Sequence, residues 1–399
     1  MAKPIARKQV PGVNLREASV VGLKVDDKPF WTEPKGIDSV HRLSRISDQH
    51  CSDIQNVMLD DGSLVSRLGT QLFSTDAQDI MAVVSFTSPS GVGYLLRVTL
   101  TGLDRWNGTS WISIASGVFS GASSDYFSFT SFGSRILMTN GVNAVYSFDV
   151  DSGAHGFLDG SSPAKHIATF GNRVVLSNTI EGPPRAYRIK WSVKNDATDW
   201  QGEGSGFEDL FGAPGGRIDD AHGVFPVTED TALAVRKDSV WQMSITGQVL
   251  APFRFSRIYS EYGSKARRSI ASIPGGVVML THDDVLVVTS RGVESIGKSV
   301  YKTILASITD FSVPKGLFDA DRREYRLTVG KSVYRYNFND KGWTKDLYPF
   351  TPRDIAIVDI QNIGLTIDEL TGTIDSLTGT IDQLVHPGGP IKDIFFVGE

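Results

Sequence analysis

The segment from Gly292 to Ser299 is the stretch of the chain whose residue types and spacing come nearest to a known chemical motif. It reads GVESIGKS and matches the phosphate-binding pattern G-x-x-x-x-G-K-[ST] at Gly292, Gly297, Lys298 and Ser299. In such a loop the lysine contacts the β- and γ-phosphates of a nucleotide, and the hydroxyl group binds Mg²⁺. Nucleotide hydrolysis is therefore one hypothesis for the function.

The sequence around this motif does not fit a nucleotide-binding fold. A working loop of this kind connects a parallel strand to a helix, whereas the neighbouring segments predict antiparallel hairpins. Glu294 would also bring a carboxylate towards the polyphosphate. We expect a turn that leads from a strand into a short amphipathic helix within 298–311, with no bound cofactor, and keep the nucleotide hydrolase as an alternative.

The other reactive residue types form no complete catalytic or metal-binding set. The seven histidines lack the i, i+4 spacing of a zinc-binding helix. Asp149, Asp151 and Gly153 resemble the start of a calcium loop, but the glutamate that would complete it is missing. Cys51 is the single cysteine, so the chain cannot form an internal disulfide. We expect a protein that is not an enzyme and that binds no metal ion.

Composition narrows the class of protein. The chain has 399 residues, of which 40% are hydrophobic, and a formal net charge of −5 from 45 acidic and 40 basic residues. Such a balance argues against a broad surface that grips phosphate backbones. The first residues lack the apolar core of a secretory signal, and no apolar run approaches 18 residues. We expect synthesis in a cytoplasm and no insertion into a membrane.

A recurring strand–turn–strand pattern predicts the fold. Four segments share it, at 169–193, 229–247, 275–292 and 321–343, and alternation of period two also marks 80–115 and 125–150. An Asp61-Gly62 pair between two apolar runs predicts a further hairpin. Recurrence at roughly 45 residues is typical of a β-propeller, whose sheets bury their faces only against one another. We predict an all-β protein: a single β-propeller of about six to seven antiparallel blades with extended terminal arms.

The predicted propeller covers residues 39–350 and has a segment at each end. Residues 1–38 contain four prolines and predict an extended N-terminal arm. Residues 351–399 contain the near-repeat TIDELTG, TIDSLTG, TIDQL and are expected to pack on the propeller or to close it. Within the propeller, 191–218 is rich in Gly, Asp and Asn and predicts a large surface loop.

Tryptophans recur on the predicted strands or at their ends. Six of them follow the strand pattern, at positions 106, 111, 191, 200, 241 and 343. We expect them to pack between blades, because large aromatic side chains bury much apolar area. The alternative is a platform for sugars, which would make the chain a carbohydrate-binding propeller.

An ordered set of segments resembles one protein family. FGNRVVLSN, RIKWSVKNDATDW, GFEDL, GGRI, DSVWQMSITG, FRFSRI and GVESIG follow one another between about residues 170 and 300. This order resembles the β-propeller nozzle or hub proteins, similar to tail tubular protein B, in the tails of short-tailed bacteriophages. The TIDELTGTIDSLTG repeat is similar to segments near the ends of such virion proteins.

The resemblance implies a structural role in the phage virion. A protein of this kind forms a ring, commonly a homohexamer, in the tail around the channel through which DNA is ejected. It joins a head-side adaptor protein to distal tail parts, with tail fibres attached nearby, and performs no catalysis. DNA would pass through the ring without sequence-specific binding, and a mildly acidic wall would suit that passage because it repels phosphates.

Overall fold

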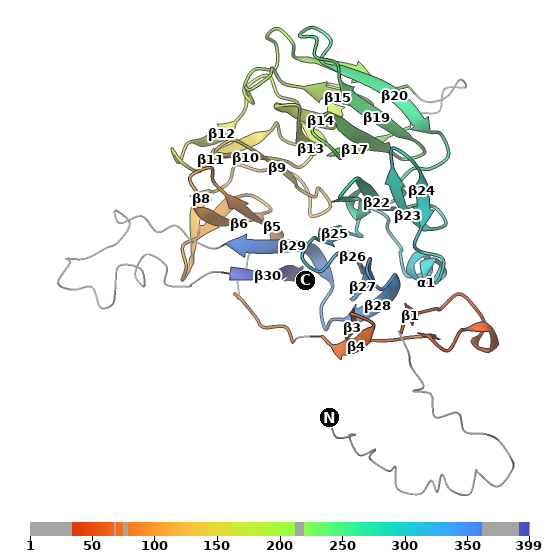
Figure 1. Ribbon diagram of the computed structural model, residues 1–399. Coiled ribbons are helices and arrows are strands. Elements are labelled where there is room, and N and C mark those ends of the chain that lie inside the picture. Colours follow the sequence, from red (N-terminus) through yellow and green to blue (C-terminus); the bar gives the residue numbers. More distant parts are fainter. Residues whose placement is uncertain (1–33, 68, 75–78, 212–218, 361–390, 399) are drawn as a thin grey trace, which may run out of the picture.

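The structure is a computed structural model that describes residues 34–67, 69–74, 79–211, 219–360 and 391–398. Its sheets are arranged like petals around one axis, so the predicted all-β propeller is confirmed (Figure 1). The TIDxLTG repeat and residues 1–33 of the predicted arm lie outside the described residues.

Six antiparallel blades, named A to F in chain order, form most of the ring. Blade A contains β5 (Ile80–Thr87), β6 (Gly93–Thr99), β7 (Leu103–Trp106) and β8 (Trp111–Ala115); blade B contains β9 (Ser128–Phe132), β10 (Arg135–Thr139), β11 (Tyr146–Asp149) and β12 (His155–Phe157); blade C contains β13 (Ala164–Phe170), β14 (Arg173–Ile180), β15 (Pro184–Trp191) and β16 (Gly206–Asp209). Blade D contains β17 (Ala221–Pro226), β18 (Thr231–Arg236), β19 (Val240–Ile245) and β20 (Phe253–Tyr259); blade E contains β21 (Ala271–Ile273), β22 (Gly276–Leu280), β23 (Val285–Thr289) and β24 (Val293–Ser295); blade F contains β25 (Gly316–Asp319), β26 (Glu324–Val329), β27 (Ser332–Asn337) and β28 (Gly342–Leu347).

The C-terminal segment occupies a seventh position in the ring. Strand β29 (Pro352–Ile360) pairs antiparallel with β30 (Ile391–Gly398), and this two-stranded sheet packs between β25 of blade F and β5 of blade A (Figure 1). The described part of the chain thus joins the last blade to the first through a half-width blade.

Residues near the N-terminus extend blade F. The short strand β1 (Gly36–Ile37) pairs in parallel with β28, and β2 (His50–Cys51) pairs with β1. The hairpin of β3 (Val57–Asp60) and β4 (Ser63–Ser66) packs against β28, and its turn at Asp61 and Gly62 confirms the predicted hairpin. Segments from both ends of the described chain therefore flank blade F.

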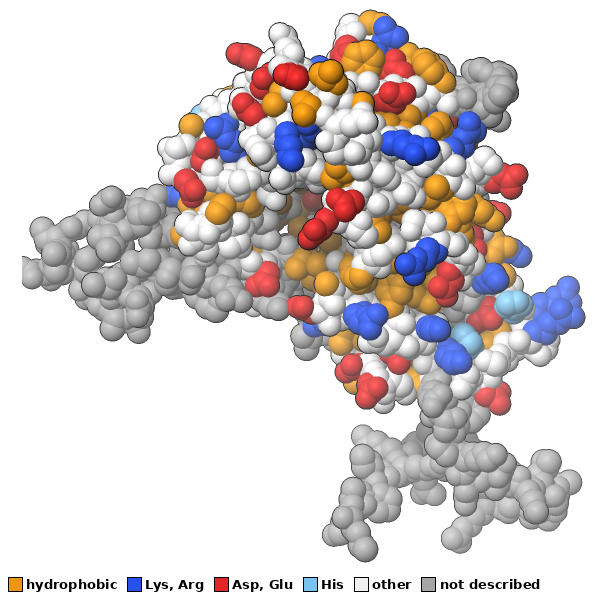
Figure 2. Space-filling model, turned by 45° about the horizontal axis from the view of Figure 1, so that its top comes forward, with side chains coloured by type: hydrophobic (Ala, Val, Ile, Leu, Met, Phe, Trp, Pro, Cys, Tyr) orange, Lys and Arg blue, Asp and Glu red, His pale blue; other side chains and the backbone are white. Residues whose placement is uncertain are grey.

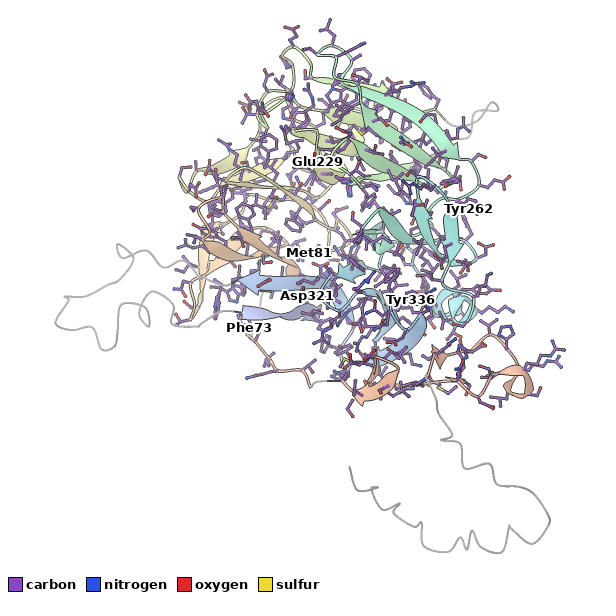
Figure 3. The ribbon with its side chains drawn as sticks, viewed as in Figure 1. Phe73, Met81, Glu229, Tyr262, Asp321 and Tyr336 are labelled. Atoms are coloured by element: carbon purple, nitrogen blue, oxygen red, sulfur yellow. The ribbon has the colours of Figure 1, made fainter. Side chains whose placement is uncertain are left out.

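The core lies between the blades, where side chains fill the spaces between neighbouring sheets (Figure 3). Val224 packs with blade C, whereas the next residue, Phe225, packs with blade E. This alternation follows from strand geometry, since successive side chains point to opposite faces of a sheet. Three of the six tryptophans, Trp191, Trp200 and Trp343, are buried in interblade clusters, and the other three are half-buried.

On the face that is turned away from blade E, blade F buries a group of charged side chains in place of an apolar core. Glu324 accepts hydrogen bonds from Arg326 at 3.0 Å and from Arg335 at 2.9 Å, and Arg335 also pairs with Asp346 at 3.2 Å. All four side chains are buried, and burial raises the pKa of Asp346 although Arg335 opposes the shift. Each charge is tolerated there because it has a partner.

One local prediction needs correction. The described part of the segment 191–218 is not simply a surface loop, because β16 completes blade C and Trp200 packs into the cluster between blades B and C. Burial against neighbouring blades decides the conformation there, which local composition does not record. The short helix expected within 298–311 is confirmed as the six residues of α1 (Tyr301–Ala306).

We predict that Gly36→Ala weakens the attachment of β1. Gly36 has φ of +81°, and an added Cβ would lie 2.0 Å from the carbonyl oxygen of Trp343. The left-handed backbone and the clash should together lower the free energy of unfolding by about 2 kcal/mol, measured by urea denaturation.

Gly292→Ala is the control, because nothing lies within 4 Å of the added Cβ and the backbone is not left-handed. Its effect should stay within about 0.5 kcal/mol. Equal effects of the two substitutions would contradict the importance of this close approach.

Candidate functional site

The motif at Gly292–Ser299 has antiparallel surroundings in the structure. Gly292 closes the turn after β23, and β24 returns antiparallel to that strand. The N–H groups of Ile296 and Gly297 both donate to the carbonyl of Val285, at 3.0 and 3.1 Å. These donors are therefore engaged, whereas a phosphate-binding loop presents free N–H groups.

The rest of the motif is used for contacts within the fold. Lys298 is exposed, and the carbonyl of Ser299 accepts a hydrogen bond from the N–H of Ser39 at 2.9 Å. An added Cβ at Gly297 would lie 2.5 Å from Asp284, so this glycine permits a close approach within blade E. This geometry does not fit a site for a triphosphate.

The other sequence candidates also form ordinary structural features. Asp149 accepts hydrogen bonds from the N–H groups of Asp151 and Ser152, as in a tight turn between strands. Burial raises the pKa of Cys51 to about 11, so its thiol stays protonated at neutral pH. Among the described residues, no group of three or more His, Cys, Asp or Glu is placed to hold a metal ion. None of the described helices is long and apolar enough to cross a bilayer.

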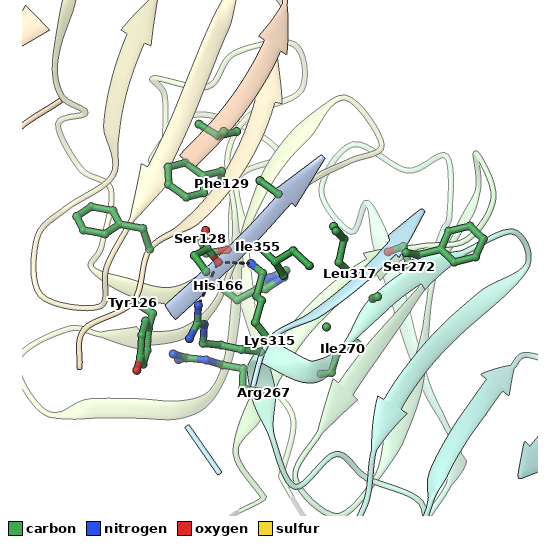
Figure 4. A pocket seen from close by; sticks show the side chains of 18 of the residues that line it. Tyr126, Ser128, Phe129, His166, Arg267, Ile270, Ser272, Lys315, Leu317 and Ile355 are labelled. Carbon is green, nitrogen blue, oxygen red and sulfur yellow. Dashed lines mark hydrogen bonds and ion pairs between the residues drawn. The ribbon is translucent and has the colours of Figure 1, made fainter. Parts of the chain in front are cut away.

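The structure instead brings together residues around the propeller axis. The first strands of the blades, with β29, line a cavity of about 450 Å³ (Figure 4). Arg353, near the start of β29, donates to the carbonyl of Ile80, the first residue of β5, at 3.5 Å. Arg268, just before β21, stacks on Tyr126, just before β9, at 3.7 Å. The starts of these inner strands therefore gather at one end of the cavity.

This end of the cavity is basic. Its lining includes four cationic side chains, Lys165, Arg267, Arg268 and Lys315, against the single carboxylate of Asp354. The local charge of about +3 contrasts with the charge of −5 for the whole chain. Charges of one sign in a cleft with apolar walls focus the electrostatic field there.

Asp354 is shared by two of the four cations. Arg268 pairs with it at 3.1 Å and Lys315 at 3.5 Å. Arg268 also donates to the carbonyls of Val313 and Arg353, at 2.9 and 2.8 Å. These contacts fix Arg268 as a structural element of the cavity wall.

Arg267 has no such partner. Within the described parts of the chain its guanidinium forms neither an ion pair nor a hydrogen bond. Burial, followed by the neighbouring charge of Arg268, lowers its pKa to about 10, and Asp125 opposes the shift. Arg267 remains cationic at neutral pH and contributes to the lining of the cavity (Figure 4).

Two histidines adjoin the basic end. His166 packs on the ring of Phe225, with centroids 4.8 Å apart, and His222 is buried beside β18. Burial, with the positive charge of Arg267 next, lowers the pKa of both to about 3. Both imidazoles are therefore neutral at physiological pH, and the Nδ1 atom of each is buried without a hydrogen-bond partner in the described structure.

Sequence reasoning missed this cavity. Its cations lie on segments separated by up to 150 positions, from Lys165 to Lys315, and none belongs to a local motif. The one feature of the sequence that could have indicated the cavity is a basic residue at or just before the start of several inner strands. The sequence predicts strands, but it does not show which strand of a blade lies at the axis.

Comparisons with known proteins give no information on the function of this site. No protein-family model matches the chain, and no curated protein matches it. One similar solved structure is an extracellular domain assigned to a hybrid two-component system of B. thetaiotaomicron, with 10% identity and a TM-score of 0.38, covering 75% of this chain and 41% of that one. Others are the WD40 β-propeller domain of Doa1 (10% identity, TM-score 0.45, 72% and 90% covered) and BBS1N in complex with ARL6DN (12%, 0.42, 70% and 84%). At these values the similarities do not bear on function.

We predict that Lys298→Ala leaves any binding of Mg-ATP unchanged. Lys298 is exposed beside a turn whose N–H groups are engaged, so it has no loop with which to hold phosphates. Calorimetric titration of both proteins with millimolar Mg-ATP tests this. Binding that the substitution abolishes would restore the nucleotide-hydrolase alternative.

We predict that His222 makes the protein sensitive to acid. Its pKa of about 3 in the folded state lies below the ordinary value of 6.5, so between these values the unfolded chain takes up a proton that the folded chain refuses. Stability is therefore lost as pH falls from about 6.5. From pH 7 to 5 the loss due to His222 should be about 2 kcal/mol.

Urea denaturation at pH 7 and pH 5 measures this loss. His222→Gln should reduce it, whereas His282→Gln, at an exposed histidine, should not. Equal losses in the wild type and in His222→Gln would contradict the assignment.

Proposed function

We propose that the chain is a structural protein of a phage virion, located in the tail, which forms an oligomeric nozzle or hub ring. The observation that carries this proposal is the position of the resembling segments in the fold. FGNRVVLSN contains most of β14, RIKWSV contains the end of β15, DSVWQMSITG covers β19 and GVESIG covers β24. The resemblance thus extends over three consecutive blades, C to E, which share interblade cores.

In this proposal DNA passes between copies of the chain. The axial cavity of one propeller measures about 450 Å³ and is lined by side chains from seven inner strands. Duplex DNA, whose major groove alone is about 12 Å wide, does not fit such a cavity. The DNA channel must therefore be enclosed by a ring of copies, for which we propose a homohexamer.

The distribution of surface charge supports passage of DNA rather than binding of DNA. Acidic and basic side chains are interspersed on the face in Figure 2, and the chain carries a net charge of −5. A mixed surface of this kind offers few contiguous cations to phosphates, so DNA is not retained by the release of counterions. Sequence-specific recognition has no role in this function.

Apolar residues at the outer edge of blades C and D are our candidates for contacts between copies. Phe207 lies on the edge strand β16 and Phe211 follows it, with 52% and 65% of their surfaces exposed. Val249 and Leu250, in the turn between β19 and β20, are 58% and 79% exposed. The carbonyl of Val249 lies 2.9 Å from the Cβ position of Gly204, so this turn packs beside the segment that leads into β16. Exposed apolar side chains along this edge favour a protein–protein contact.

The proposed partners follow from the position in a tail. The ring binds an adaptor protein on the head side and distal tail parts or fibres on the other, and the chain is made in the host cytoplasm before it joins the virion. A carbohydrate-binding propeller is less well supported, because none of the six tryptophans at positions 106, 111, 191, 200, 241 and 343 is exposed.

We predict that the chain is present in purified phage particles as a ring in the tail. Mass spectrometry of particles and electron microscopy of the tail measure its presence, position and symmetry. The double substitution Phe211→Asp with Leu250→Asp should reduce incorporation of the chain, because it places charges where copies meet.

Leu43→Asp is the matched control, since Leu43 is 77% exposed but lies in the loop between β1 and β2 beside blade F (Figure 1). It should leave incorporation unchanged. Absence of the chain from particles would overturn the proposed function, and equal effects of the variants would overturn the assignment of the contact surface.

A further inference from the structure

We propose that the basic end of the axial cavity is a binding site for a small multivalent oxyanion of the phosphate or polycarboxylate class, held by Arg267 together with Lys165. This inference concerns one propeller by itself and does not depend on the proposed function. The site is formed by residues before or within the inner strands of three blades and by β29.

Part of the positive charge in the cavity has no negative charge opposite it. Asp354 is occupied by Arg268 and Lys315, so Arg267 and Lys165 have no carboxylate partner among the residues that line the cavity. Arg267 is partly removed from water, and such a cation is costly unless an anion faces it, whereas Lys165 is exposed and adds its charge to the site. An oxyanion of two or three charges matches the local excess of about three positive charges.

The guanidinium group of Arg267 has the chemistry that an oxyanion site needs. A guanidinium presents a planar fork of N–H donors that fits two oxygens of one phosphate or carboxylate group. The donors of Arg267 form no hydrogen bond within the described structure, whereas those of Arg268 are directed to fixed carbonyls. Arg267 is thus the guanidinium with donor capacity left for a ligand.

The size of the cavity and the residues of its wall also suit a small anion. A volume of about 450 Å³ lies in the range of sites for small molecules, roughly 300 to 1,000 Å³. Apolar side chains, including Phe129, Phe225 and Leu317, form much of the remaining wall. They lower the local dielectric constant, which strengthens the attraction between the cations and a bound anion. The small volume also favours a small anion over a nucleic-acid strand.

Calorimetric titration with pyrophosphate and with citrate, at constant ionic strength set by sodium chloride, tests the site. We expect saturable binding of one molecule per chain for at least one of the two anions, and comparison of the two separates phosphate from carboxylate chemistry. A single-stranded oligodeoxynucleotide is the third ligand, and its binding in the absence of binding by either small anion would overturn the proposal.

Arg267→Gln should weaken binding of the small anion about tenfold or more, since one charged hydrogen-bonding group is lost. Arg254→Gln removes the same charge from the exposed outer strand β20 and should change affinity less than twofold. Equal weakening by both substitutions would mean that only net charge matters and would overturn the site.

Folding of the variants is checked by melting in chloride without the anion. Arg267→Gln removes a cation that forms no ion pair within the described residues, so its melting temperature should equal or exceed that of the wild type. Lys165→Gln, at an exposed position, provides a second variant that should also weaken binding. Binding that is unchanged in both variants, or no binding in the wild type, would overturn the proposal.

Discussion

Every blade of this propeller has two faces, and neither can be buried without a neighbour. On β17, Val224 contributes to the core with blade C and Phe225 to the core with blade E. Because side chains alternate along a strand, a residue pattern that fills one interface also supplies the next. The ring with its seventh, two-stranded position is therefore the unit that buries all the faces, and no single blade is a domain.

Closure of the ring depends on segments that are distant in sequence. Strands β29 and β30 lie between blades F and A, and β1 extends blade F from the other end of the chain. Blade F also buries the charged group of Glu324, Arg326, Arg335 and Asp346. Loss of one member would leave a buried charge without its partner, so the group constrains which residues this blade tolerates.

The same architecture concentrates charge at the axis. The inner strands start at one end of the cavity, so cations near these starts meet there although the chain as a whole is acidic. Arg268 is fixed by Asp354 and by backbone carbonyls, whereas Arg267 is not. A chain that is acidic as a whole can therefore still present a chemically distinct basic pocket at the axis of its fold.

By itself, the sequence determined the all-β class, the approximate number of blades and the hairpin at Asp61 and Gly62, because alternation and turn chemistry are local properties of the chain. It also predicted that the tryptophans pack between blades. It did not reveal that β16 completes blade C, since the segment 191–218 has the composition of a loop. Only the tertiary structure decided which residues meet at the axis. Lys165, Arg267 and Lys315 come together because strands far apart in the chain are adjacent in the ring, and no local pattern encodes that adjacency.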